Sequence, residues 1–156
     1  EKIPFPDSYF DSVFSSEVFE HVFNLSEILK EINRVLQIQG NLLITIPFAW
    51  FEHETPYDFA RYTSYGIRYL LEDNGFEIVK EEKTTGYFLA IIQMIIVYLR
   101  INIFTSDSKI LKSIYYLLIF APINIFGLIF SKILPEDYGY YLSNVILSKK
   151  VRNINS

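Results

Sequence analysis

Three side chains able to do chemistry together stand close along one aromatic and polar segment: His53, Asp58 and Arg61. An imidazole titrates near neutral pH, which suits the removal of a hydroxyl proton. A carboxylate can orient that ring, and a guanidinium offers a planar fork to a carboxylate or phosphate. A structural alternative stays open, in which Asp58 and Arg61 pair to hold the loop and Thr63 caps the next helix. The segment predicts a substrate-facing loop with His53 as the candidate base.

The elements expected to position this loop are a strand, a helix and a second strand. Residues 10–15 form a short apolar run that predicts a strand buried on both faces. Residues 24–40 begin with a capping sequence, continue with an apolar stripe of helical period, and end at Gly40 as a left-handed residue. Residues 42–46 predict the second strand. This order predicts a right-handed parallel crossover, with the loop 48–63 at its end.

The remainder of the chain completes an α/β pattern. A helix is expected over residues 64–74 and ends at Gly75, and residues 77–82 alternate like a strand near an edge. Residues 140–148 predict a last strand before a polar tail. The predicted fold class is therefore α/β, with the earlier strands of the sheet outside this chain.

Composition excludes several kinds of site. Cysteine is absent, which excludes a disulfide framework or a thiolate metal site. Only two histidines are present, and zinc sites usually need His or Cys ligands, so no metal site is expected. Residues 1–85 carry 15 acidic and 7 basic side chains, which argues against nucleic acid as a partner. Residues 86–134 carry one acidic and four basic side chains among apolar ones, which indicates lipid contact.

Three motifs in series carry a family resemblance. The run IPFPDSYFDSVFSSEVFEH at residues 3–21 precedes LKEINRVL at 29–36 and GNLLITIP at 40–47. This series resembles the C-terminal portion of a Rossmann-like (class I), S-adenosylmethionine-dependent methyltransferase of the type 11 family. The resemblance implies a partial methyltransferase sheet, with parallel strands and a final antiparallel hairpin, plus an inserted apolar helical pair.

The glycine-rich turn that holds the cofactor in such a fold is not in this sequence. No two of its glycines lie within two positions of each other; they stand at 40, 66, 75, 86, 127 and 139. We expect a fragment or a truncated gene that does not bind the cofactor without a first half.

By the same resemblance, Ser15, Ser16 and Glu17 lie beside the methionine part of S-adenosylmethionine. His21 is expected to support that wall of the cofactor site from behind. A plainer alternative is that the two serines only leave the strand and that Glu20 is solvated.

The stretch before the last strand is strongly apolar. Residues 86–104 hold a single charge, and residues 110–134 are nearly as apolar, so either reaches the length needed to span a bilayer. The expected organisation is a methyltransferase half over 1–85, an apolar helical insert over 86–134, and the last strand with a polar tail over 135–156.

Three placements of this insert stay open. In one, two helices lie in or dip into one leaflet of a membrane. In another, they form a spanning hairpin, which would carry Asp107 and Lys109 across. In the third, they form a soluble lid over the substrate site.

The resemblance implies methyl transfer, which is expected at a hydroxyl oxygen, and the apolar insert indicates a lipid-linked glycan or another lipophilic acceptor. His53, Asp58 and Arg61 would take the catalytic, substrate-facing positions, with S-adenosylmethionine as the cofactor. The expected location is the cytoplasm, at the inner face of the membrane. The rivals are a catalytically inactive membrane-docking module and a small membrane protein of incidental resemblance. The acceptor and the oligomeric state stay open.

Overall fold

The computed structural model describes residues 2–154, which form two compact units. The first unit contains the described residues up to Thr84 together with those from Ser143 onward. The second unit is the intervening segment, Thr85–Leu142. Each unit is described separately below.

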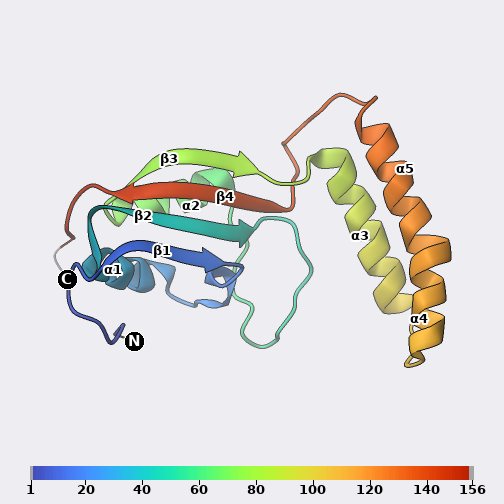
Figure 1. The fold of residues 1–156 in the computed structure, drawn as a ribbon, viewed down its shortest axis with the longest axis horizontal. Helices are drawn as coiled ribbons and strands as arrows, with labels where there is room; N and C mark the ends of the chain where they lie inside the picture. The colour runs from blue at the N-terminus through green and yellow to red at the C-terminus, as the bar shows by residue number, and fades with distance from the viewer. Residues whose placement is uncertain (1, 155–156) are drawn as a thin grey trace. The chain divides into compact units, whose positions relative to one another are not determined.

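The first unit is built on a four-stranded sheet in the order β1-β2-β4-β3 (Figure 1). Its strands are β1 (Phe10–Ser16), β2 (Leu36–Pro47), β3 (Phe76–Lys83) and β4 (Ser143–Lys150). Strand β1 pairs with β2 in parallel, whereas β4 is antiparallel to both of its neighbours. The predicted parallel crossover and the predicted final antiparallel hairpin are therefore confirmed.

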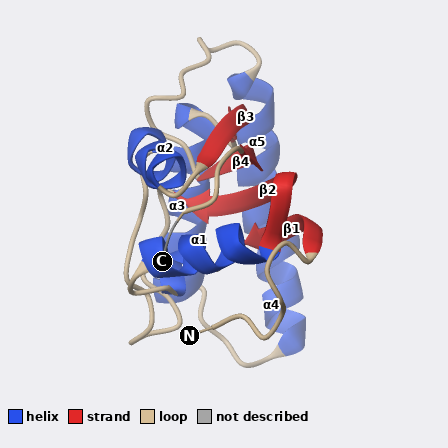
Figure 2. Ribbon diagram, turned by 90° about the vertical axis from the view of Figure 1, so that its left-hand side faces the viewer, coloured by secondary structure: helices blue, strands red, loops and turns tan. Residues whose placement is uncertain are grey.

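Two helices cover one face of this sheet (Figure 2). They are α1 (Leu25–Val35) and α2 (Ser64–Asp73). Apolar side chains of both helices form one core with alternate residues of the strands; its fully buried members include Leu29, Leu42, Ile44, Ile67, Leu71 and Ile146. Thr63 caps α2 by accepting a hydrogen bond from the Gly66 amide at 3.1 Å, as expected.

The prediction that the first strand is buried on both faces is wrong. Val13 packs against the core, but Phe14 points to the opposite face and is 66% exposed. Its partner in the register, Leu43, is also exposed. The reason is that β1 is an edge strand and that the helices of the first unit, α1 and α2, lie on one side of the sheet.

The prediction that Gly40 ends the helix is also wrong. Helix α1 stops at Val35 and the chain passes directly into β2, so Gly40 lies inside a strand. A Cβ atom there would stand 2.9 Å from the Asp11 carbonyl and 2.8 Å from the Gln37 carbonyl. Glycine is required by this close approach next to a register shift in β1, and the left-handed residue is its neighbour Gln39 (φ 69°).

The second unit is the expected pair of apolar helices. Helix α3 (Tyr87–Asn102) leads through a short loop to α4 (Lys109–Tyr115), the π-helical turn η2 (Tyr116–Phe120) and α5 (Ala121–Ser131). Residues Lys109–Ser131 form one continuous helix, and its most apolar 18-residue window has a mean hydropathy of 2.0. By length and composition this helix could cross a membrane.

The two helices share a small apolar core and approach closely at Gly127. Gly127 of α5 lies against Ile92 of α3, where an added Cβ would stand 3.1 Å from its side chain. Nearby, the Gln93 amide donates a hydrogen bond to the Asn124 side-chain oxygen at 2.8 Å. Most other apolar side chains of the unit are partly or largely exposed.

Candidate functional site

The carboxyl ends of β1 and β2 form the floor of the candidate site. The Ser16 and Thr45 hydroxyls are 2.8 Å apart, and the Glu17 amide donates to the Thr45 carbonyl at 3.0 Å. Glu17 then takes a left-handed conformation (φ 49°), which turns the chain out of the sheet. Ser15, Ser16 and Glu17 therefore stand at the strand end, as the sequence predicts, with the last two exposed.

A one-turn helix, η1 (Phe19–His21), ties the loop 48–63 to this floor. The carbonyl of Glu20 accepts hydrogen bonds from the amides of Phe59 at 2.8 Å and of Ala60 at 3.3 Å. The His21 Nδ1 lies 2.8 Å from the Tyr57 carbonyl. These backbone contacts bring two distant segments of the sequence into one site.

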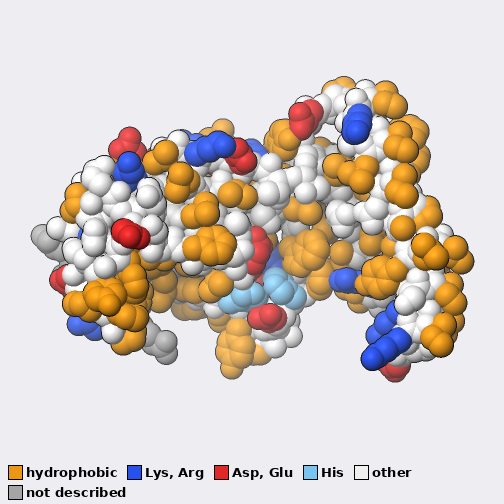
Figure 3. Space-filling view, in the orientation of Figure 1, with side chains coloured by type: hydrophobic (Ala, Val, Ile, Leu, Met, Phe, Trp, Pro, Cys, Tyr) orange, Lys and Arg blue, Asp and Glu red, His pale blue; other side chains and the backbone are white. Residues whose placement is uncertain are grey.

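The two histidines meet where these segments are joined. The ring centroids of His21 and His53 are 4.8 Å apart at an angle of 77°. Figure 3 shows the two histidine side chains next to each other on the surface, beside acidic atoms. From the sequence, His21 was expected beside the cofactor and His53 at the substrate, and their contact was not predicted.

Asp58 and Arg61 form a closed ion pair inside the loop. Arg61 donates to both carboxylate oxygens of Asp58 at 2.6 Å, and its other donors reach backbone carbonyls; these belong to Trp50, Phe51 and Ala60. The hydrogen bonds from Arg61 hold the pKa of the Asp58 carboxyl far below its usual range. This geometry agrees with the structural alternative, in which the two side chains pair to hold the loop. The guanidinium has no N–H left to bind a substrate anion. A substrate-binding role for Arg61 stays a prediction.

The ring of His53 is held through its Nδ1 atom. That atom lies 3.2 Å from the Phe51 carbonyl and 3.4 Å from the Asp58 carboxylate. The Asp58 carboxylate also accepts the His53 backbone amide at 2.9 Å. The Arg61 guanidinium, a donor, also lies 3.4 Å from this Nδ1 atom. The two acceptors, the Phe51 carbonyl and the Asp58 carboxylate, nevertheless favour a proton on Nδ1. The Nε2 lone pair of His53 is then free to accept a proton or bind a ligand.

Glu20 is buried, contrary to one of the expectations from the sequence. It was taken as solvated in the plainer alternative, yet its side chain is 0% exposed and neither carboxylate oxygen has a hydrogen-bond partner. Burial raises the pKa of its carboxyl. No sequence pattern marks this burial, because Glu20 lies in a one-turn helix without periodicity. The fold buries it beneath the loop 48–63.

Contact of Ser15, Ser16 and Glu17 with S-adenosylmethionine stays a prediction. The exposed strand end at Ser16 and Glu17 leaves room for a ligand beside the unpaired edge of β1. No glycine-rich turn lies in the sequence to receive the rest of such a molecule. The fit is therefore partial: these residues offer a floor and not a full binding site.

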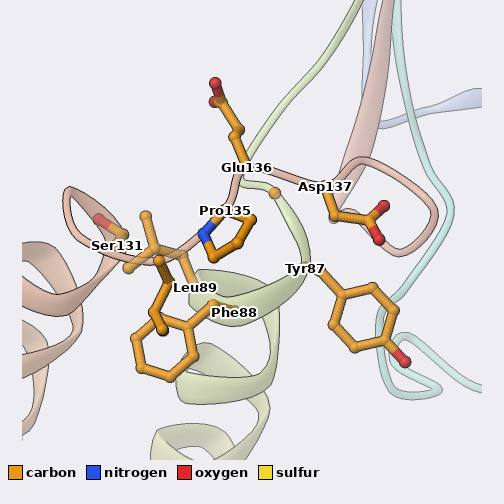
Figure 4. Close-up of a pocket in the computed structure, with 9 residues that line it drawn as sticks. Tyr87, Phe88, Leu89, Ser131, Pro135, Glu136 and Asp137 are labelled. Atoms are coloured by element: carbon orange, nitrogen blue, oxygen red, sulfur yellow. The ribbon is translucent and has the colours of Figure 1, made fainter.

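A separate cavity lies in the second unit. It measures about 100 Å³ and is lined by the start of α3 and by the end of α5 with the residues that follow it, among them Phe88, Leu89 and Pro135. Figure 4 shows these three side chains close together, with Glu136 pointing away from them. This volume is well below the roughly 300 Å³ at which small-molecule sites begin.

Comparison with known proteins gives a family match over the first part of the chain. Residues 1–44 match the family model described as a methyltransferase domain. A glycine/sarcosine/dimethylglycine N-methyltransferase of Actinopolyspora halophila is 39% identical over 49 residues, which are 31% of this chain and 9% of that protein. Residues 1–44, which match the family model, contain β1, α1 and most of β2.

Solved structures show the same fold at low sequence identity. The [4+2]-cyclase SpnF has a TM-score of 0.54 at 14% identity, over 96% of this chain and 52% of that one. Phosphoethanolamine N-methyltransferase 2 of Haemonchus contortus, in complex with S-adenosyl-L-methionine, has a TM-score of 0.53 at 16% identity, over 95% and 35%. The chain thus has a class I methyltransferase fold and spans about half or less of these proteins.

Proposed function

We propose that the chain forms the second half of an S-adenosylmethionine-dependent methyltransferase domain, because its first 44 residues match a methyltransferase domain and its fold resembles that of a solved methyltransferase. Its acceptor is a hydroxyl group on a lipophilic molecule, such as a lipid-linked glycan. The observation that carries the proposal is the parallel pairing of β1 with β2, because the family match covers that pair and the helix between them.

The roles in this proposal follow from the geometry of the loop. When bound, S-adenosylmethionine would supply a sulfonium methyl group for transfer to the acceptor oxygen, with S-adenosylhomocysteine as the leaving group. The Nε2 atom of His53 accepts the hydroxyl proton, and Asp58 orients that ring through Nδ1. Arg61 holds Asp58 in place. Ser15, Ser16 and Glu17 form the floor beside the cofactor, and His21 supports it from η1; these lie at the strand end and in the turn that follows.

Cofactor binding requires a first half of the fold in this proposal. The sequence lacks the glycine-rich turn, and Phe14 and Leu43 expose apolar surface on the uncovered face of the sheet. In the related structures about half or more of the chain lies outside the shared region. Additional strands and helices would cover this face and the free edge of β1.

The second unit supports a lipophilic acceptor and a location at the inner face of the membrane. In the most apolar window of its long helix only 11% of the residues are buried, so most side chains there are exposed. Helix α3 has 16 residues, or about 24 Å, which is shorter than the roughly 20 residues that cross a bilayer. A pair of unequal helices favours insertion into one leaflet over a spanning hairpin.

The experiment joins this chain to an intact, glycine-rich first half of a methyltransferase domain. The fusion is incubated with radiolabelled S-adenosylmethionine and a membrane lipid extract. The proposal predicts label in the organic-soluble fraction, and a His53→Gln variant should reduce the rate about 100-fold. A Glu27→Gln variant is the control, because this exposed carboxylate lies in α1 away from the loop.

A second candidate function is a membrane-docking module without catalysis, which the exposed apolar surface of the second unit favours. The same experiment separates the two. A fusion that binds S-adenosylhomocysteine and floats with liposomes, yet transfers no methyl group, would overturn the enzyme proposal and support docking.

A further inference from the structure

Glu20, His21 and His53 place three metal-ligating side chains around one point in the first unit. One ligand atom from each lies within 4.8 Å of the others. The His21 Nε2 is 3.8 Å from a Glu20 carboxylate oxygen. Ligand atoms around a tetrahedral zinc ion stand about 3.3 Å apart, so small side-chain rotations would close the set.

The buried carboxylate of Glu20 is the second, independent sign of a ligand. Both of its oxygens are buried without a hydrogen-bond partner, and the side chain is 0% exposed. A buried charge of this kind is costly unless it is paired or coordinates a metal. Arg61, the nearest arginine in the loop, is fully engaged by Asp58 and by backbone carbonyls. Arg61 therefore acts on Glu20 through its charge but makes no hydrogen bond to it.

Both histidines are held as metal-bound imidazoles usually are. Such a ring donates its second N–H to a carbonyl or a carboxylate, which fixes the tautomer. The Nδ1 of His21 faces the Tyr57 carbonyl, and the Nδ1 of His53 faces the Phe51 carbonyl and the Asp58 carboxylate. In both rings the Nε2 lone pair is left for a ligand.

From this arrangement we infer that Glu20, His21 and His53 form a binding site for a divalent transition-metal ion such as Zn²⁺. Two imidazoles and one carboxylate leave a fourth position for water or for a group from outside the chain. Glu54 lies at the rim, with its carboxylate 3.9 Å from the His21 Nε2. Its side chain is 75% exposed, so it is free to reach this fourth position.

The metal site shares the His53 Nε2 atom with the proposed methyl transfer. A lone pair cannot hold a cation and accept a proton at once, so metal binding and the base role of His53 exclude each other. Metal binding is measured with the ion alone. The two proposals can therefore fail independently.

The test is calorimetric titration of the untagged 156-residue chain with Zn²⁺, with Mg²⁺ as the comparison ion. We expect one Zn²⁺ per chain and no binding of Mg²⁺ at the same concentration, because Mg²⁺ prefers oxygen ligands. Glu20→Gln, His21→Gln and His53→Gln should each weaken Zn²⁺ binding by about 100-fold or more. Glu27→Gln should leave it unchanged.

Two further readouts guard against misfolded variants. Circular dichroism should show that each variant keeps its fold, and Co²⁺ bound to the wild-type chain should give visible absorption bands that Zn²⁺ abolishes. Absence of stoichiometric binding, or binding that survives all three substitutions, would overturn the inference. In that case Glu20 is a protonated buried acid only.

Discussion

Single side chains of the loop 48–63 divide into those that hold it and those that face a ligand. Asp58 and Arg61 hold it, since every donor of the guanidinium is used within the loop. His21 and His53 each keep one ring nitrogen for a ligand. The loop therefore holds two imidazoles in fixed positions next to the buried Glu20.

The Asp58–Arg61 pair should be a main source of the loop's stability. Asp58→Asn keeps the shape but leaves the guanidinium without its counter-charge, so the free energy of unfolding should fall by about 2–3 kcal/mol. Urea unfolding measures it. Asp73→Asn, at the exposed end of α2, should change it by less than about 0.5 kcal/mol.

The pH dependence of this difference follows from the depressed pKa of Asp58. A lowered folded-state pKa gives stability that is present above the ordinary pKa of an aspartate, about 3.9, and is lost only as pH falls below it. The gap between wild type and Asp58→Asn should therefore be equal at pH 7 and pH 5. A gap that closes between these values would contradict the pair's role.

The sequence was sufficient to predict residue types at the site but not their partners. His53, Asp58 and Arg61 are close in sequence, so their grouping was visible. The contact of His53 with His21 depends on backbone hydrogen bonds from the Phe59 and Ala60 amides to the Glu20 carbonyl, which no periodicity reveals. The burial of Glu20 arises from the same long-range contact.

At the scale of elements, the β1–α1–β2 crossover was predictable because its apolar pattern is strong. Its boundaries were not. The chain turns from α1 into β2 without a loop, and Gly40 serves a close approach between strands instead of a helix end. A glycine that ends a helix and one that permits strand packing look alike in sequence.

Gly40→Ala tests this close approach. The added methyl group would meet two backbone carbonyls at under 3 Å, so β1 and β2 must shift apart. We expect a loss of about 2–3 kcal/mol in unfolding free energy, measured by urea titration. Gly66→Ala is the matched control, since its nearest neighbour is the Thr63 hydroxyl at 3.3 Å. It should change stability by less than about 0.5 kcal/mol, and equal losses in both would refute the explanation.

For the whole molecule, the two units differ in how much of their apolar side-chain surface they bury. The first unit buries a compact core under α1 and α2. The second keeps a small core and exposes apolar side chains along both helices. The apolar runs predicted helices here, but composition alone did not distinguish a membrane-bound pair from a lid.

Liposome flotation tests the membrane role of the second unit. Replacing Leu117 and Leu118, which are 70% and 66% exposed, by serine should lower the partition coefficient about 10-fold or more per residue. Replacing Tyr65 and Tyr69 by serine is the control, because these side chains, 82% and 68% exposed on α2 of the first unit, are at least as exposed. Equal effects from both pairs would exclude a specific role for the second unit.

The most direct test of the account is an NMR titration of this chain with S-adenosylhomocysteine. If the sheet is the second half of a methyltransferase domain, shift changes should concentrate at the amides of Ser15, Ser16 and Glu17. The affinity should be weak, in the millimolar range, because the chain offers only one wall of the site. Micromolar affinity would contradict the need for a first half. Saturable shifts elsewhere with none at the end of β1 would contradict the assignment itself.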